Sequence, residues 1–144
     1  MAKRELIRMF CPYVPETVID KFAETWRSGW IGQGPKVDEF EKEFSKKFGL
    51  SYVVALNSAT SGLRLAYAIA GVGPGDEVIT TPHTMVATNT TILEQFAKPI
   101  FADVQYETVN IDPQDIEHRI TEKTKAIVCV HWSGYPCDMD ELHK

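Results

Sequence analysis

From residue 52 onward, short apolar runs alternate with longer stretches in which apolar residues recur at helical spacing. A short apolar run bounded by turn-forming residues is typical of a strand, whereas recurrence at every third or fourth position indicates a helix with one buried face. The pattern predicts a short extended piece at 109–111, strands at 52–56, 77–80, 99–102 and 126–131, and helices at about 59–70, 84–96 and 113–120. This alternation indicates an α/β fold with a mostly parallel sheet and flanking helices.

Two further helices are predicted before this region. Apolar residues recur at helical spacing between residues 18 and 26, and Pro35 suits the first position of a second helix that Gly49 ends. The second helix carries an apolar stripe that we expect to lie in the core, formed by Val37, Phe40, Phe44 and Phe48. We therefore divide the chain into an N-terminal helix and loop, residues 1–34, and an α/β region, residues 35–144.

A glycine-rich loop at 28–35 joins these two helices. It carries two large apolar residues, Trp30 and Ile31, which need a surface to pack against if they are to leave water. Two interpretations stay open. The loop folds over the core of its own chain, or it covers another subunit or a substrate.

Small and hydroxylated residues fill the turn between the first predicted strand of the α/β region and the helix that follows it. The turn reads Asn57-Ser58-Ala59-Thr60-Ser61. The first amides of a helix have no partners within it, and the helix dipole adds partial positive charge there, so this turn suits a phosphate or another anion. The alternative is a plain helix cap, made by Asn57 or Ser58, with nothing bound.

Composition narrows the function classes. The chain has 144 residues, of which 44% are hydrophobic, and its formal net charge of -5 with no basic block argues against nucleic acid as a partner. No apolar run is long enough to cross a bilayer, and the charged start does not resemble a signal peptide. The three cysteines form no CxxC pair, which fits free thiols in a reducing cytoplasm.

Two histidines fall just after predicted strands. His83 and His131 fall at the carboxyl edge of the predicted sheet, where ligands bind in folds of this type. His83 either faces a site there or is simply a loop residue, and His131 shares the same favourable position. Cys129, His131 and Cys137 could contact one zinc ion, but their spacing matches no common zinc pattern and a fourth ligand is missing. We therefore predict no metal site. The last residues, 138–144, read as the start of a helix, and we expect the chain to be a truncated form of a longer protein.

Eight segments of the chain follow one another in an order and spacing that match a known family. They are residues 28–41, 57–63, 73–79, 84–88, 101–104, 110–113, 121–127 and 131–140. Together they resemble the DegT/DnrJ/EryC1/StrS group of pyridoxal-phosphate enzymes, which are mostly nucleotide-sugar aminotransferases. The resemblance extends from about Phe10 to the last residue.

The resemblance implies the N-terminal part of the large domain of fold type I, a homodimer with shared active sites, and pyridoxal 5'-phosphate as the cofactor. By position, Ala59 and Thr60 would hold the cofactor phosphate with Ser58 beside them. Met85 stands where the family usually has an aromatic residue stacked on the pyridine ring, and a thioether packs on a ring less specifically. His131 and Asp103 fall near the cofactor end of the sheet.

The residues that carry the chemistry in this family are not matched by any segment of the chain. The aspartate that pairs with the pyridine nitrogen and the lysine that forms the internal Schiff base would both follow Lys144, so we assign no catalytic residue here. The resemblance implies transfer of an amino group, often from glutamate, to a keto-sugar nucleotide. The alternatives are a sugar dehydratase of the same family and a non-catalytic binding or dimerising fragment.

Overall fold

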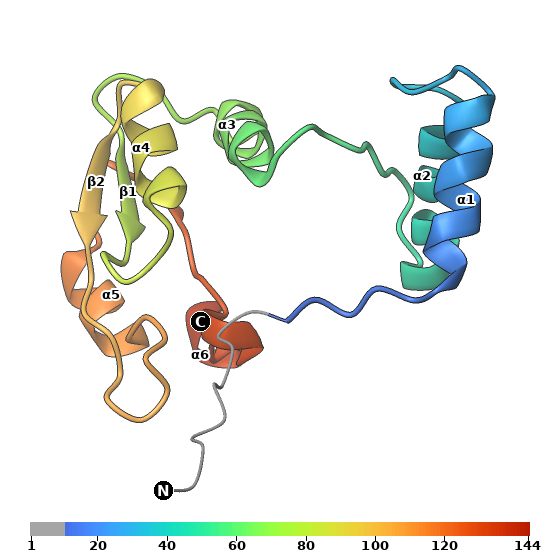
Figure 1. Cartoon of the computed structure of the whole chain (residues 1–144). Helices are drawn as coiled ribbons and strands as arrows, with labels where there is room; N and C mark the ends of the chain where they lie inside the picture. Colours follow the sequence, from blue (N-terminus) through green and yellow to red (C-terminus); the bar gives the residue numbers. More distant parts are fainter. Residues whose placement is uncertain (1–10) are drawn as a thin grey trace, which may run out of the picture. The chain divides into compact units, whose positions relative to one another are not determined.

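The computed structural model describes residues 11–144, and Figure 1 traces their helices and strands. The chain divides into two compact units, the first of which ends at Ala55 and the second of which spans Leu56–Lys144. The boundary after residue 34 that the sequence pattern favours remains a proposal about the domains of the folded protein.

Two helices make up the described part of the first unit, α1 (Thr17–Arg27) and α2 (Pro35–Phe48). Pro35 occupies the first turn of α2, where its missing N–H has no helical partner to lose. Gly49 ends α2 in the left-handed conformation, with φ of 66°, and its N–H bonds to the carbonyl of Ser45. Both ends of α2 therefore lie where the sequence predicts them.

The aromatic stripe of α2 is not buried, so the prediction that it lies in the core is wrong for this structure. Phe40, Phe44 and Phe48 are all exposed, and neighbouring rings lie with centroids 5.6 Å (Phe40 to Phe44) and 4.4 Å (Phe44 to Phe48) apart. No described residue of α1 or α2 is buried. Two helices alone cannot enclose a stripe of large side chains, because each helix supplies a neighbour on only one side.

The strand predicted at 52–56 is also absent from the structure. These residues have no strand assignment, and Tyr52 and Val54 are exposed. A strand exists only where a neighbour accepts and donates its backbone hydrogen bonds. Among the described residues, the segment 52–56 takes part in no strand pairing.

The second unit contains a parallel three-stranded sheet, formed by β1 (Glu77–Thr80), β2 (Lys98–Phe101) and β3 (Thr124–Ile127). The order is β2-β1-β3, and Ile79 of the central strand pairs with Ile100 and with Ile127. β1 matches its predicted range. β3 ends four residues before the predicted end at His131, although Val128 still donates to the carbonyl of Ile79 at 2.8 Å.

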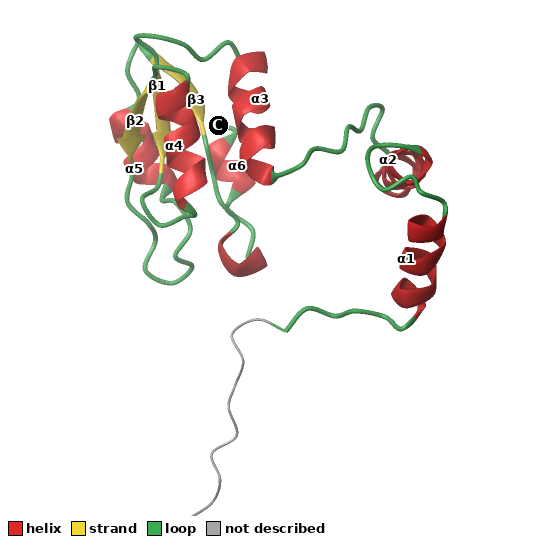
Figure 2. Cartoon of the chain, turned by 45° about the horizontal axis from the view of Figure 1, so that its top comes forward, coloured by secondary structure: helices red, strands yellow, loops and turns green. Residues whose placement is uncertain are grey.

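Helices cover both faces of this sheet. They are α3 (Ala59–Ile69), α4 (Val86–Glu94), α5 (Pro113–Arg119) and the short α6 (Met139–Leu142). α4 is shorter at both ends than the predicted 84–96, because Met85 is extended and Phe96 adopts a positive φ of 59°. Figure 2 shows α3 and α4 side by side, and the two helices are in contact. The fold class is thus the expected α/β sheet with flanking helices.

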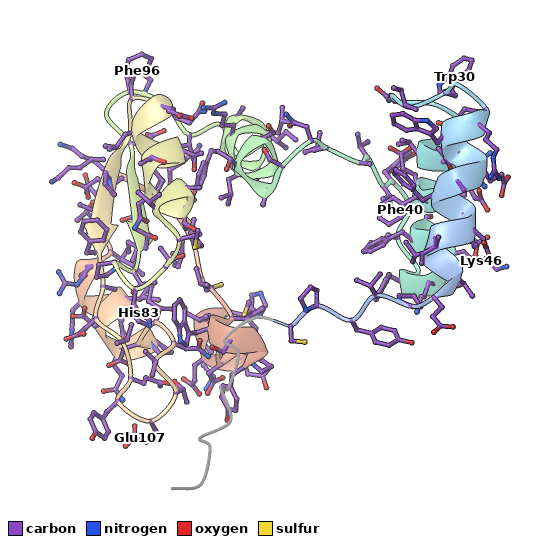
Figure 3. The ribbon with its side chains drawn as sticks, viewed as in Figure 1. Trp30, Phe40, Lys46, His83, Phe96 and Glu107 are labelled. Atoms are coloured by element: carbon purple, nitrogen blue, oxygen red, sulfur yellow. The ribbon has the colours of Figure 1, made fainter. Side chains whose placement is uncertain are left out.

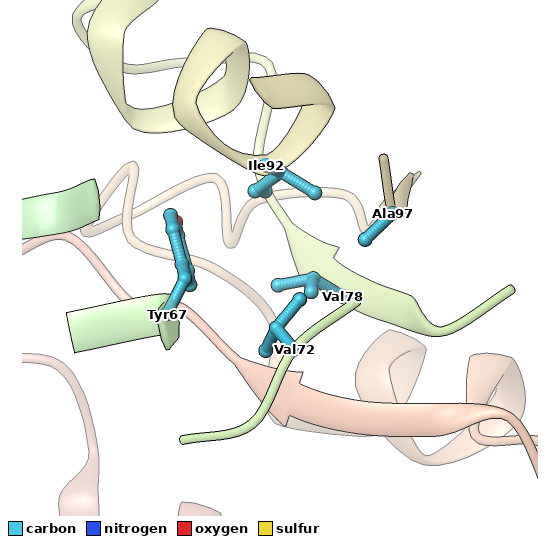
Figure 4. Packing of buried hydrophobic residues seen from close by; sticks show 5 residues of the cluster. All are labelled: Tyr67, Val72, Val78, Ile92 and Ala97. Carbon is cyan, nitrogen blue, oxygen red and sulfur yellow. The ribbon is translucent and has the colours of Figure 1, made fainter. Parts of the chain in front are cut away.

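Two hydrophobic clusters hold the helices to the sheet. Val78 lies on one face with Tyr67 of α3 and Ile92 of α4, as Figure 4 shows, together with Val72 and Ala97. The next residue, Ile79, lies on the opposite face in a cluster with Ala102, Ile111, Ile116 of α5 and Cys137. This alternation of neighbouring side chains is the two-residue period of a strand, so both faces of β1 are covered. Among residues 11–144, no helix is long and apolar enough to cross a membrane.

Candidate functional site

The amino end of α3 has the capped geometry that its sequence predicts. Ser58 is extended, with φ of -164° and ψ of 157°, and its Oγ accepts a hydrogen bond from the N–H of Ser61 at 3.2 Å. Asn57 supports the cap indirectly, because its Oδ1 accepts from the Ser61 hydroxyl at 2.7 Å. Ser58 rather than Asn57 is therefore the N-cap residue.

The cap leaves two donors free. Within the described part of the chain, the N–H groups of Ala59 and Thr60 have no hydrogen-bond partner. Ala59 is exposed and Thr60 is partly exposed. Two free amides at the positive end of a helix dipole, with the Thr60 hydroxyl next to them, form a donor set that fits a phosphate group. The cap and an anion site are thus compatible.

Contacts to α4 and to the sheet fix the direction of α3. The hydroxyl of buried Tyr67 donates to the carbonyl of Thr88 at 3.0 Å, and Arg64 forms a bidentate ion pair with Glu94 of α4. A short loop, residues 70–76, leads from the carboxyl end of α3 to the start of β1. A helix joined to a strand in this way runs opposite to it, so the amino end of α3 is directed toward the edge at which the strands end.

At that edge, the turn after β1 carries His83 and Met85. The side chain of Asn89 holds this turn from α4, since its Oδ1 accepts from the Thr80 hydroxyl at 2.8 Å and its Nδ2 donates to the carbonyl of Thr81 at 3.0 Å. Met85 is the extended residue before α4, and its side chain is 75% exposed. A thioether in this position is free to pack on a planar ligand.

His131 lies in the loop that follows β3. Its Nδ1 accepts a hydrogen bond from the N–H of Cys137 at 3.0 Å. When the imidazole is neutral, this bond assigns its proton to Nε2, which is left as a donor. The side chain is exposed, so this donor is available at the carboxyl edge of the sheet.

The turns that carry Met85 and His131 meet through aromatic side chains. The rings of His83 and Trp132 lie with centroids 4.0 Å apart at an interplanar angle of 49°. Figure 3 labels His83 in this part of the second unit. The structure thus brings the regions around two predicted site residues together, whereas no hydrogen bond in the described residues joins Ser58–Thr60 to either of them.

Sequence reasoning did not single out Asn110, which is 2% exposed. Its Nδ2 donates to the carbonyls of Tyr135 and Pro136, both at 3.0 Å, and its Oδ1 accepts from the N–H of Trp132 at 2.9 Å. An asparagine two residues before the helix start at Asp112-Pro113 was the available signal. Its partners lie more than 20 residues away in the chain, so no local pattern could reveal them.

Asp103 is exposed at the end of β2, and its backbone rather than its carboxylate makes the longer-range contacts. Its N–H donates to Asp115 Oδ2 at 2.7 Å, and its carbonyl accepts from the N–H of Asp112 at 2.9 Å. Arg119 pairs with Asp115 and, together with the Asp103 amide, lowers the pKa of that carboxyl. These bonds join α5 to the end of β2.

The cysteines of this region make protein contacts. Cys137 is buried and its Sγ donates to the carbonyl of Val130 at 3.3 Å, while Cys129 packs against the same hydrophobic cluster. Burial raises the pKa of the Cys137 thiol. Within residues 11–144, no three histidine, cysteine or acidic side chains are placed to hold one metal ion.

Known proteins are similar to this chain over nearly its whole length. The family model of the DegT/DnrJ/EryC1/StrS aminotransferase family matches residues 12–144. The spore coat polysaccharide biosynthesis protein SpsC of Bacillus subtilis is 47% identical over 91% of this chain and 34% of its own length. A UDP-4-amino-4-deoxy-L-arabinose–oxoglutarate aminotransferase of Shewanella sediminis is 40% identical over 96% of this chain and 36% of its own length.

Solved structures agree. A proposed sugar aminotransferase of Streptococcus pneumoniae, in its PLP form, matches with a TM-score of 0.85 at 41% identity, over 92% of this chain and 34% of that protein. The likeness supports fold type I for the α/β unit. The chain spans between 34% and 37% of the length of the curated relatives that it matches.

Proposed function

Because the chain belongs to the DegT/DnrJ/EryC1/StrS aminotransferase family, we propose that it supplies the cofactor-phosphate site of a pyridoxal-phosphate enzyme that transfers an amino group to a keto-sugar nucleotide. The named relatives support the class of substrate, since one acts on a UDP-linked amino sugar and another serves polysaccharide synthesis. Oxoglutarate in the name of one relative supports glutamate as the amino donor.

One observation carries the proposal, namely the two free amides of Ala59 and Thr60 at the capped start of α3. The phosphate of pyridoxal 5'-phosphate carries close to two negative charges, and free backbone N–H groups at a helix start bind such a group without needing a lysine or arginine. The residues present therefore fit the cofactor at its phosphate end.

The other candidate contacts are Met85 and His131. The exposed thioether of Met85 would pack against the cofactor ring, and Nε2 of His131 would donate to a polar atom of the cofactor or substrate. Pyridoxal phosphate, when bound, supplies the electron sink that amino-group transfer requires. The chain's own residues bind and orient it, and we assign no proton transfer to any of them.

We also propose a homodimer and a cytoplasmic location for the protein. Trp30 and Ile31, which are 60% and 68% exposed, give the first unit an apolar surface suited to a second subunit. The absence of any disulfide among the cysteines at 11, 129 and 137 is compatible with a reducing compartment.

The test removes one amide donor without disturbing the helix. Ala59 is the first residue of α3, where proline is well tolerated, and Ser58 already has the extended conformation that a following proline requires. Ala59→Pro should therefore weaken binding of pyridoxamine 5'-phosphate about tenfold or more, through loss of a charge-assisted hydrogen bond. Pyridoxamine phosphate is the better ligand for calorimetry because it has no aldehyde to react with surface lysines.

Ala59→Ser is the matched control, because it changes the side chain and keeps the N–H. Its affinity should stay within about twofold of the wild type, as expected for a surface substitution. Equal affinities of Ala59→Pro and Ala59→Ser for pyridoxamine 5'-phosphate would show that the amide of Ala59 does not bind the phosphate. No measurable binding by the wild-type chain would contradict the proposed cofactor site altogether.

A further inference from the structure

The side-chain amide of Asn110 makes three hydrogen bonds to the backbone of the protein. Its two Nδ2 hydrogens go to the carbonyls of Tyr135 and Pro136, and its Oδ1 accepts from the N–H of Trp132. The side chain is buried, so water cannot replace these partners. A single side chain therefore holds both ends of the segment 132–136, which follows His131.

That segment has a backbone that needs outside support. Ser133 has a positive φ of 52° and Gly134 a φ of 82°. A residue other than glycine in the left-handed region costs free energy, and it persists where surrounding contacts over-determine it. The three bonds of Asn110 are such contacts, because they join the residues on either side of Ser133 and Gly134.

Asn110 is itself firmly placed. Its carbonyl accepts from the N–H of Gln105 at 2.9 Å, and the next residue, Ile111, is 1% exposed and bridges Val104. Asp112 then caps α5 through a bond from the N–H of Gln114 at 3.0 Å. The anchor of the segment 132–136 thus lies on a buried and hydrogen-bonded stretch of backbone.

The effect of Asn110 extends to the turn after β1. The backbone N–H of Trp132 donates to Asn110, and the Trp132 ring packs at a tilt against the ring of His83. His83 is two residues from Met85. The Met85 turn follows β1, whereas the His131 loop follows β3. The His83–Trp132 contact joins them at a point that Asn110 fixes.

We propose that Asn110 is a positioning residue, which presets the His131 loop directly and the Met85 turn through the His83–Trp132 contact. This inference rests on the proposed function in so far as Met85 and His131 contact the cofactor. Asn110 itself makes these side-chain bonds to backbone atoms of the protein.

The first measurement reads the position of Trp132 without any ligand. The chain has three tryptophans, and replacing Trp26 and Trp30 by phenylalanine in the first unit leaves Trp132 as the reporter. In this background, Asn110→Ala should increase quenching of Trp132 by acrylamide about twofold or more, because released loops move on faster timescales and admit the quencher. His83→Ala, at an exposed position that does not threaten folding, should increase quenching as well.

Val78→Ala is the matched control. It removes buried methyl groups from the opposite face of the sheet and so lowers stability, yet it leaves every bond of Asn110 in place. Quenching in Val78→Ala should equal that of the parent. Equal quenching in Asn110→Ala and the parent, or an equal increase in Val78→Ala, would overturn the proposal.

The second measurement is the affinity for pyridoxamine 5'-phosphate by calorimetry. Asn110→Ala should bind about tenfold more weakly than Val78→Ala, in line with the loss seen when groups that orient ligand-binding residues are removed. Affinities that fall equally in both variants would show a merely structural role and contradict the proposal. If the parent chain does not bind the ligand, the proposed function fails, while the quenching comparison still decides whether Asn110 positions the two loops.

Discussion

The hydroxyl of Tyr67 donates to the carbonyl oxygen of Thr88 at 3.0 Å, so a side chain of α3 is hydrogen-bonded to the backbone of α4. Tyr67 is buried in the cluster around Val78, and burial raises the pKa of its hydroxyl. This bond links the helix that carries the free amides to the helix that begins after Met85. It is thus a contact on which the arrangement of the candidate site depends.

Tyr67→Phe should lower the free energy of unfolding by about 1 kcal/mol, since the hydroxyl is lost while its ring remains. The loss is moderate because Thr91 Oγ1 also approaches the Thr88 carbonyl, at 3.3 Å. Urea unfolding measures the change. A loss as large as that of a core truncation, about 3 kcal/mol or more, would mean that the ring had moved as well.

Alkaline titration provides a separate test of the same residue. The folded pKa of Tyr67 is raised above the unfolded value of about 10. Its contribution to stability is therefore fully present below about pH 10, and it is lost as the pH rises through the folded pKa. Ultraviolet titration of the wild type should show a tyrosine that ionises late, above about pH 10. Tyr67→Phe should remove this late ionisation, and an unchanged titration curve in Tyr67→Phe would contradict burial of the hydroxyl.

Trp30 should respond to a methyl group on a neighbouring glycine. The indole covers Gly34, where an added Cβ would lie 1.7 Å from Nε1, and the indole N–H donates to the Gln33 carbonyl at 2.7 Å. Gly34→Ala must therefore displace the ring, and a red shift of tryptophan emission relative to a Gly32→Ala control should report it. Gly32 is suited to this use because nothing lies within 4 Å of its added Cβ.

Self-association is expected through the first unit. Trp30 and Ile31 are exposed, and so are the aromatic residues of α2. Light scattering at rising concentration should show dimers or larger species, because exposed apolar surface of this kind is covered in assemblies. Ile31→Lys should shift the equilibrium toward monomer. A chain that stays monomeric at high concentration would contradict this expectation.

Treatment with pyridoxal phosphate and borohydride should label no single lysine of the 144-residue chain stoichiometrically. Hydrogen bonding to Glu39 raises the pKa of Lys36, and Glu141 does the same for Lys144. Both amines therefore stay protonated and weakly nucleophilic at neutral pH. Mass spectrometry should find scattered, partial labelling. One lysine labelled to completion would identify a reactive amine that the motif comparison missed.

The three cysteines should react with iodoacetamide in the order Cys11, Cys129, Cys137. Cys11 is exposed, Cys129 is partly buried and Cys137 is buried, and burial raises the pKa of Cys137. Because the thiolate is the reactive form, Cys137 should react about tenfold or more slowly than Cys11. Peptide mapping over time measures the three rates. In urea the rates should become similar.

Local sequence was sufficient where the structure depends on neighbouring residues. Pro35 and Gly49 mark the ends of α2, as the pattern predicts, and α5 begins at Pro113, the start of the predicted helix 113–120. The cap at Ser58 follows the same rule, because a helix end is satisfied by side chains within three or four residues. The family motifs are also short local segments, so the sequence by itself indicates the candidate phosphate site.

Tertiary structure alone decided the rest. The apolar run 52–56 reads as a strand, yet a strand needs a hydrogen-bonded partner, and this segment has no strand pairing among the described residues. The phenylalanine stripe of α2 reads as core, yet it is exposed because burial depends on what lies opposite. Asn110 shows the converse, since an ordinary polar residue is buried by partners 22 to 26 residues away. The sequence pattern indicates which side chains of a segment can be buried and which groups can form hydrogen bonds. The tertiary structure determines whether a partner for that burial or bonding lies close enough.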